Sequence, residues 1–119
     1  MNKLFLLLLS VFIFLFVSDF QAQTYNMSNS TINSCGGNFY DSGGIGNYAN
    51  SQMITMTFCS STPGADIVID FTSFDLESGY DFLSIYDGNN AGSPLIGTYS
   101  GTTLPGAFTS STGCLTFVF

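Results

Sequence analysis

The side chains best suited to binding a metal ion are carboxylates, and most of them lie in one stretch of the sequence. Of the eight Asp and Glu residues, six fall in the segment from Asp66 to Asp87. Within it, Glu77 and Asp81 occupy a polar segment between two strand-like runs. Carboxylates and backbone carbonyls are the ligands that Ca²⁺ selects. Glu77 and Asp81 are therefore candidate calcium ligands, although a solvated acidic turn explains the same spacing.

The residue types give little support for a catalytic function. The chain has no histidine, so the Ser-His and Cys-His nucleophile systems are excluded and a zinc site lacks its usual ligands. A glycosidase needs a pair of carboxylates, which Asp75, Glu77 and Asp81 could supply. A small domain leaves little room for the deep cleft that such an enzyme needs. We expect a binding protein with no catalytic residues.

The N-terminal residues predict export from the cell. A short start with Lys3 is followed by an apolar run over residues 4–17, which only Ser10 interrupts, and then by polar residues around Ala22. This is the pattern of a secretory signal peptide over residues 1–22. The alternative, an uncleaved anchor, needs about 20 apolar residues to cross a bilayer. We expect a secreted or cell-surface protein with no membrane span after cleavage.

The remaining chain is acidic and has no positive side chain. The only basic residue is Lys3, and seven acidic residues remain once Asp19 is removed with the leader, because 8 − 1 = 7. Nucleic acid is a poor partner for such a chain, since phosphate binding depends on clustered Lys and Arg. A divalent cation, or a protein or glycan ligand with basic groups, is favoured.

The segments that position the carboxylates are predicted to be β-strands. Residues 23–34 are polar and predict a flexible lead-in. The Gly-rich residues 35–50 predict an ordered loop or a short irregular strand. Runs rich in Phe, Tyr, Ile, Val and Thr follow, with turn residues every 8 to 12 positions. This spacing is typical of an all-β sandwich or barrel. The expected strands are residues 52–58, 65–71, 82–86, 94–99, 107–110 and 114–119.

The odd count of three cysteines predicts one disulfide and one further cysteine, which is either a leftover thiol or has a partner that is missing from this chain. Cys35 and Cys59 flank the Gly-rich loop, 24 positions apart. We expect a bond between them, because exported chains rarely keep two buried thiols. A loop of that length would add about 3 kcal/mol of stability. Cys114 is then left unpaired.

Several blocks of the sequence occur in the order found in one known family. From residue 35 to residue 119, the chain resembles a CUB domain. The block YDFLSIYDG beside the block IVIDFTSFDLE is specific for that family. The matching blocks are residues 35–37 (CGG), 46–48 (GNY), 59 (C), 67–77 (IVIDFTSFDLE), 80–88 (YDFLSIYDG), 95–101 (LIGTYSG) and 110–119 (SSTGCLTFVF).

The resemblance implies a jelly-roll sandwich of two antiparallel sheets that binds protein or carbohydrate outside the cell. In calcium-binding members of the family, the Glu of the LE block, the Asp of the YD block and a later Asp hold the ion. By position, these imply Glu77 and Asp81 as metal ligands and Tyr48, in the early loop, as a supporting residue. The bound ion orients acidic groups toward a basic side chain of the partner, which suits a chain without cations.

The sequence departs from the family in three places. The family's second disulfide would join a position just before the YD block to one near Ser100, but Gly79, Tyr80 and Ser100 stand there. The later Asp would follow Phe119. Cys114 would find its natural partner further on. We therefore expect a fold that is incomplete at its C-terminus, with an unpaired sheet edge along residues 114–119.

A second hypothesis needs no metal. In this case, the chain is a carbohydrate-binding or adhesive sandwich that uses exposed aromatic side chains. The candidates are Tyr40, Tyr48, Tyr86 and Tyr99.

Overall fold

A computed structural model describes residues 22–119, and this part of the chain contains nine strands and no helix. All but the last residue of the expected signal peptide lie outside the described residues. The strands are β1 (Thr24–Asn26), β2 (Ser30–Ser34), β3 (Asn38–Tyr40), β4 (Thr55–Ser60), β5 (Val68–Asp70), β6 (Leu83–Asp87), β7 (Leu95–Tyr99), β8 (Ala107–Thr109) and β9 (Cys114–Val118).

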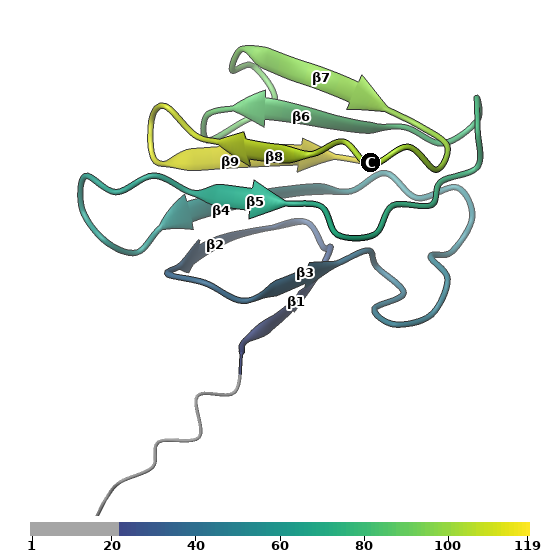
Figure 1. Ribbon diagram of the computed structural model, residues 1–119, viewed down its shortest axis with the longest axis horizontal. Helices are drawn as coiled ribbons and strands as arrows, with labels where there is room; N and C mark the ends of the chain where they lie inside the picture. Colours follow the sequence, from purple (N-terminus) through teal and green to yellow (C-terminus); the bar gives the residue numbers. More distant parts are fainter. Residues whose placement is uncertain (1–21) are drawn as a thin grey trace, which may run out of the picture.

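The strands form two layers (Figure 1). One layer is a five-stranded sheet in the order β2-β4-β9-β6-β7, and the other holds two separate pairs, β1-β3 and β5-β8. The expected all-β sandwich is confirmed, but its sheets are not wholly antiparallel, since β1 pairs with β3 and β2 with β4 in parallel. The reason is the crossover through β3: the chain leaves the five-stranded sheet after β2 and returns in the same direction as β4.

Alternation along the strands builds the core between the layers. Met56 and Phe58 of β4 and Leu115 and Phe117 of β9 are buried on the inner face of the five-stranded sheet. The facing layer contributes Ile69 and its neighbours at alternate positions. Every other residue of the segment 65–71 is partly buried and packs on this core, while the residues between them are exposed. This alternation is that of a strand with one face on the core, and the strand expected in this segment is confirmed over its central residues as β5.

The expected flexible lead-in is wrong, because residues 24–34 form two strands of the fold. Tyr25 packs edge-on against Phe58, with ring centroids 5.4 Å apart, and its hydroxyl donates to Ser34 Oγ at 2.9 Å. Met27 is 6% exposed. The apolar residues at alternate positions of this polar tract are what anchor it to the core.

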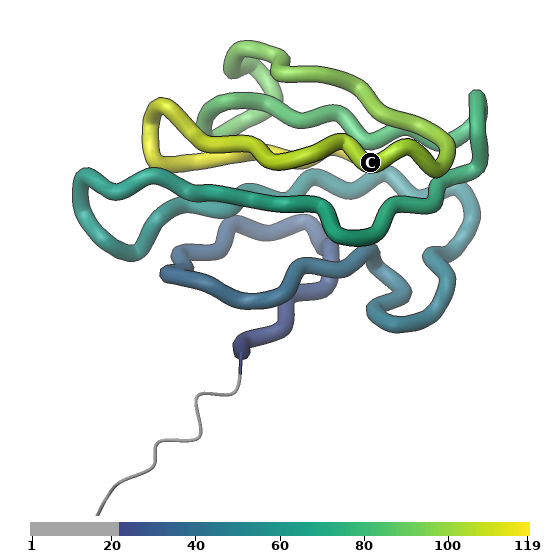
Figure 2. The backbone as a smooth tube through the Cα atoms, in the orientation of Figure 1, coloured from purple at the N-terminus to yellow at the C-terminus, as the bar shows by residue number. Residues whose placement is uncertain are grey.

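The unpaired edge expected along residues 114–119 is also wrong. The strand β9 lies in the middle of the five-stranded sheet, where it pairs antiparallel with β4 on one side and β6 on the other. Leu115 and Phe117 have no exposed surface. In the described part of the chain, the pairs β1-β3 and β5-β8 are not hydrogen-bonded to each other. Their neighbouring strands in the second layer are β3 and β5 (Figure 2).

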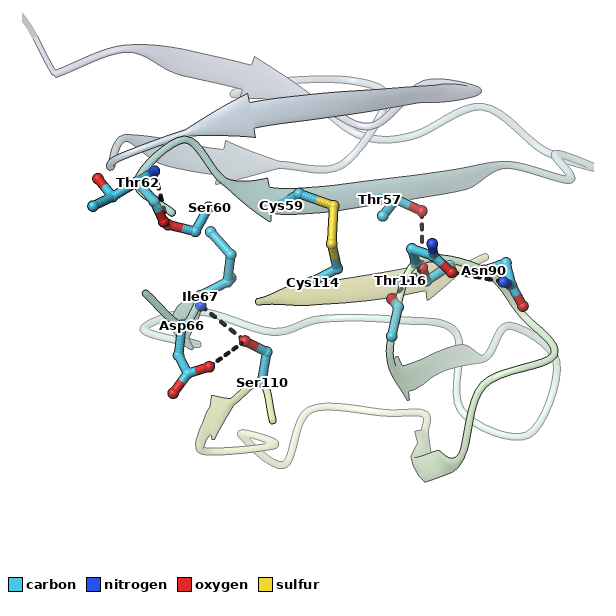
Figure 3. The surroundings of a disulfide bond; sticks show 12 residues. Thr57, Cys59, Ser60, Thr62, Asp66, Ile67, Asn90, Ser110, Cys114 and Thr116 are labelled. Carbon is cyan, nitrogen blue, oxygen red and sulfur yellow. Dashed lines mark hydrogen bonds between the residues drawn. A yellow bond between two sulfur atoms is a disulfide. The ribbon is translucent and has the colours of Figure 1, made fainter. Parts of the chain in front are cut away.

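The expected Cys35–Cys59 bond is wrong, because the disulfide joins Cys59 to Cys114 (Figure 3). These two residues stand directly opposite each other in the β4–β9 register, with Cα atoms 4.1 Å apart. Cys35 has an exposed free thiol. It follows the end of β2 and lies two residues beyond Asn33, the register partner of Cys59. Two strand residues advance about 6.6 Å, which takes Cys35 away from Cys59 along the sheet.

The disulfide gives a first prediction. Its loop spans 55 positions, for which chain-entropy arguments give about 4 kcal/mol of stabilisation. We expect Cys59→Ser and Cys114→Ser to lower the melting temperature similarly, and Cys35→Ser to leave it nearly unchanged. In the folded protein, a thiol reagent should label only Cys35. Peptide mapping that recovers a Cys35–Cys59 cross-link would contradict this assignment.

The side chain of Asp87, the last residue of β6, is hydrogen-bonded to the turn between β8 and β9. Its Oδ1 accepts a hydrogen bond from Ser111 N at 2.8 Å, and its Oδ2 accepts one from Ser111 Oγ at 2.6 Å. These two hydrogen bonds from Ser111, the side-chain one first, hold the pKa of the Asp87 carboxyl below its usual value. The carboxylate therefore joins strands that are far apart in the sequence.

This clamp gives a second prediction, on acid stability. Because folding lowers the pKa of Asp87, its contribution is fully present above the usual Asp value of about 3.9 and is lost as the pH falls through the lowered pKa. We expect Asp87→Asn to lower the melting temperature at neutral pH and to flatten its decline below about pH 4. Asp70→Asn, which removes an exposed carboxylate, serves as the matched control. If the melting temperatures of Asp87→Asn and of the wild type decline equally below about pH 4, the hydrogen bonds of Asp87 do not stabilise the fold as proposed.

Candidate functional site

The acidic loop, defined here as residues 74–82, lies between β5 and β6 and is ordered by one backbone hydrogen bond to another segment and two within the loop. Leu76 N donates to Gly101 O at 3.0 Å, and the amides of Tyr80 and Asp81 both donate to Glu77 O, at 3.1 and 3.0 Å. The Glu77 carbonyl thus closes a tight turn around Gly79, whose φ is 79°. Glycine adopts this left-handed conformation without steric cost.

A hydrogen bond joins the two regions where the family pattern has a disulfide. Gly79 N donates to Ser100 Oγ at 3.0 Å, and Ser100 Oγ in turn donates to Glu77 O at 3.3 Å. One serine hydroxyl therefore ties the acidic loop to the end of β7. Although the sequence lacks the two cysteines of the family pattern here, the loop is still anchored, by a hydrogen bond that is weaker than a covalent bond.

Tyr48 connects the Gly-rich loop to the acidic loop. Its hydroxyl donates to Asp81 Oδ2 at 2.7 Å and accepts a hydrogen bond from Glu77 N at 3.1 Å. Its ring packs edge-on against Phe119, with centroids 4.9 Å apart. The structure thus brings Tyr48 and Asp81 into direct contact and places the Glu77 backbone beside them, 29 positions away from Tyr48 in the sequence.

The charges of this site favour a neutral Tyr48. The hydrogen bond to the Asp81 carboxylate is the main cause that raises the pKa of Tyr48, with smaller contributions from burial and from the charges of Asp81 and Glu77, while the Glu77 backbone hydrogen bond opposes them. The phenol therefore stays protonated and keeps donating to Asp81. With no Lys, Arg or His in residues 22–119, no side chain competes with an external cation for these carboxylates.

The oxygen atoms at this site are the type of ligand that a hard cation binds, but few of them belong to carboxylates. Asp81 is half-buried and fixed by Tyr48, whereas the Glu77 side chain is exposed. Residues 22–119 contain no group of three or more His, Cys, Asp or Glu residues placed to hold one ion. Because Ca²⁺ takes six to eight oxygens, Glu77 and Asp81 would need backbone carbonyls, water or further donors beside them.

Two exposed aromatic side chains flank Asp81 and were not expected as site residues. Tyr80 is 79% exposed and Phe82 is 47% exposed. Large apolar side chains beside a charge on a surface loop are common at the centres of protein interfaces. The signal in the sequence was their alternation with Leu83 and Ile85, the core residues of β6, which predicts that Tyr80 and Phe82 face away from the core.

The four tyrosines of the metal-free hypothesis do not form one platform. Tyr40 is on β3 and is 36% exposed. Tyr99 packs toward the core against Phe108, with centroids 5.6 Å apart. Tyr86 lies on the opposite face of the same sheet, because it alternates with the core residue Ile85. Tyr48 is engaged with Asp81.

A search of the described residues for a long apolar helix that could cross a bilayer finds none.

Comparisons with known proteins match the family suggested by the sequence blocks. The CUB domain family matches residues 28–119, so the match begins within the segment first expected to be a flexible lead-in. Rat cubilin is 35% identical over 97 residues, covering 71% of this chain and 3% of cubilin. Mouse neuropilin-2 is 37% identical over 82 residues, covering 60% of this chain and 9% of its own length.

Human multiple epidermal growth factor-like domains protein 8 is 34% identical over 70 residues, covering 59% of this chain and 2% of its own length. The chain thus spans less than a tenth of each of these relatives. The match to the family, in contrast, covers the whole two-layered fold except β1. On this evidence, the chain belongs to the CUB domain family.

Proposed function

We propose that this chain is an extracellular interaction module that binds a protein or glycan ligand through its acidic loop and depends on calcium to do so. CUB domains bind proteins and occur in extracellular and cell-surface proteins, which gives the general class. The observation that carries the proposal is the Tyr48 hydroxyl, which links the Asp81 carboxylate to the Glu77 amide. This link holds the Asp81 carboxylate beside the backbone of Glu77, whose side chain is the second candidate ligand.

Calcium would act as the organiser of the loop. Glu77 and Asp81 would hold the ion, with Tyr48 fixing the Asp81 carboxylate from the second side. A carboxylate held this way loses little freedom on binding, which lowers the entropic cost. An ion at this point would also neutralise part of the repulsion among the carboxylates of the loop and leave others to receive a basic group of the ligand.

The exposed side chains of Tyr80 and Phe82 would supply the apolar part of the contact. They precede and follow Asp81 in the sequence and are exposed, so a ligand that presents a Lys or Arg to the loop could contact them as well. An aromatic side chain can also bind the cationic group through its ring face. The proposed role is binding, with no catalytic step.

The metal-free carbohydrate hypothesis is the second candidate. It is weakened by the separation of its tyrosines, of which Tyr99 packs toward the core and Tyr48 is engaged with Asp81. A glycan array in the presence of EDTA separates the two hypotheses, because binding that persists under chelation would favour the metal-free one.

Calcium binding gives a third prediction. At about 5 mM Ca²⁺, a site with the affinity of extracellular modules should be largely filled. Linkage then raises the melting temperature by roughly 5–15 °C. We expect Glu77→Gln and Asp81→Asn to remove most of this shift, as measured by differential scanning fluorimetry with Ca²⁺ or EDTA.

Asp70→Asn is the matched control, because it removes one carboxylate on β5, outside the loop, and should keep the calcium shift. Mg²⁺ at the same concentration should give a smaller shift, since it accepts fewer ligands and a stricter geometry. A wild-type protein whose melting temperature is the same with Ca²⁺ and EDTA would refute the calcium part of the proposal.

Tyr48 gives a fourth prediction. Tyr48→Phe removes the hydroxyl but keeps the ring against Phe119. We expect a loss of about 1 kcal/mol of stability and, separately, a calcium affinity lowered several-fold, because Asp81 is no longer held in place. Isothermal titration of Ca²⁺ measures the second effect. A variant that loses stability but binds Ca²⁺ with unchanged affinity would show that Tyr48 has a structural role only.

A further inference from the structure

The strand β7 forms one outer edge of the five-stranded sheet (Figure 1). It pairs antiparallel with β6 on one side, and no strand within residues 22–119 pairs with its other side. The strand β6 separates it from β9. Backbone N–H and C=O groups along such an edge are free to pair with a strand of another chain.

The ladder between β6 and β7 decides which backbone groups of β7 face the open edge. At its start, Asp87 N donates to Pro94 O at 2.9 Å. The register then shifts by one residue and continues in three pairs, which are Ile85–Gly97, Ser84–Thr98 and Leu83–Tyr99. Hydrogen-bonded pairs alternate with non-hydrogen-bonded pairs, whose side chains are closer, and the Ser84 and Thr98 hydroxyls lie 2.9 Å apart. The N–H and C=O of Thr98 therefore point away from β6.

This edge is uncharged and partly apolar in a chain that is otherwise acidic. Residues 88–119 contain no charged side chain, so all seven carboxylates of the described chain lie before them. On β7, the side chains of Leu95 and Ile96 are 56% and 38% exposed. Edge strands are commonly kept apart by charged side chains, and this edge has none. The opposite edge strand, β2, exposes the polar side chains of Thr31 and Asn33.

We propose that two copies of this chain pair through this edge, with their β7 strands antiparallel about a two-fold axis at Thr98. The N–H and C=O of each Thr98 then bond to those of the other, and the two five-stranded sheets become one continuous sheet. The contact is isologous, because the same edge serves both copies, so it closes at a dimer. It goes beyond the proposed calcium-dependent role and needs neither the ion nor the acidic loop.

Charge selects a second copy as the occupant of this edge. A strongly basic or acidic partner would gain no attraction from an edge that has no charged side chain. Two acidic copies, in contrast, repel each other over most of their surfaces and can approach where carboxylates do not face each other. The edge at β7 meets that condition, and its exposed Leu95 and Ile96 add apolar surface to be covered.

Charge also selects antiparallel over parallel pairing. Ser100 ties the acidic loop to the end of β7. Pairing about Thr98 sets Ser100 of one copy opposite Ile96 of the other, so the two Ser100 residues lie about 14 Å apart along the strands. That exceeds the Debye length of about 8 Å, whereas parallel pairing would bring the two acidic loops side by side. At the other end, Asp87 lies one strand further in, with its carboxylate bound to Ser111.

The fifth prediction is a weak, concentration-dependent dimer of the full chain. Five strand residues span about 17 Å, and a contact of this size is typical of transient association. We expect sedimentation equilibrium over about 10 μM to 1 mM protein to show a monomer–dimer equilibrium. The Thr98 amide should exchange its hydrogen more slowly as the protein concentration rises, because dimerisation gives it an acceptor. Both effects should be the same with Ca²⁺ and with EDTA, so failure of this inference is distinguishable from failure of the calcium proposal.

Charged substitutions at Thr98 test the two-fold axis itself. Thr98→Lys and Thr98→Glu each place like charges opposite each other, so each should lower the association constant at least about tenfold. An equimolar mixture of the two variants should restore association to about the wild-type level, because Lys then faces Glu. Thr31→Lys, the matched change on β2, should leave association unchanged. Thr98→Ser keeps the hydroxyl and the N–H and should dimerise like the wild type, and melting temperatures establish that each variant is folded.

Three results would overturn the inference. The first is a wild-type chain that stays monomeric at about 1 mM. The second is association that persists in both charged Thr98 variants or disappears in Thr31→Lys, which would place the contact elsewhere on the molecule. The third is association that requires Ca²⁺, which would place it at the acidic loop.

Discussion

The pairing of β9 with both β4 and β6 is the interaction on which the rest of the structure depends. These strands lie far apart in the sequence, and β9 joins them into one sheet with Leu115 and Phe117 fully buried beneath the other layer. On the outer face of the same strand, the Thr57–Thr116 hydroxyl pair and the Cys59–Cys114 bond cross to β4 (Figure 3). Hydrophobic burial on one face and specific cross-strand bonds on the other fix the register.

The candidate site inherits its geometry from that sheet. Phe119 follows β9 directly, and its ring supports Tyr48, whose hydroxyl in turn holds Asp81. The acidic loop is anchored on its other side by Ser100 at the end of β7. Two loops that are remote in the sequence meet only because β6, β7 and β9 are neighbours. The loop residues are thus exposed, while the framework that orients them is rigid.

The distribution of charge gives the molecule one consistent preference. Without a Lys, Arg or His in residues 22–119, no carboxylate of this region is neutralised by an internal ion pair, so each relies on solvent or on hydrogen bonds such as those to Asp81 and Asp87. Cations and basic groups of a ligand are attracted to every surface of such a chain. At the acidic loop, the Asp81 carboxylate, which Tyr48 holds in place, adds an ordered oxygen donor to this attraction.

The strands from β4 onward were predictable from sequence, because their alternating apolar residues fall at positions such as Ile67, Ile69 and Phe71, and burial requires that pattern. The strands β1 and β2 were missed, because they are short, rich in Asn and Ser, and paired with partners that a local pattern does not reveal. The strand β3 lies in the Gly-rich segment, for which a short irregular strand was one of two expectations. Tyr48 was identified by family resemblance and not by spacing, since its contact with Asp81 crosses 33 positions. Glu77 and Asp81 were candidates from residue type, and the family resemblance favoured them over a solvated acidic turn; their role as calcium ligands stays a prediction.

By itself, the sequence determined the β-class, the carboxylate-rich loop and the absence of histidine chemistry, because these follow from composition and short-range periodicity. Only the tertiary structure decided which cysteine pairs with Cys59, because the choice depends on the β4–β9 register and not on separation along the chain. It likewise decided that β9 is a central strand of the five-stranded sheet. The physical reason is the same in each case: strand pairing joins distant segments, and the free energy of a register is a property of both strands together.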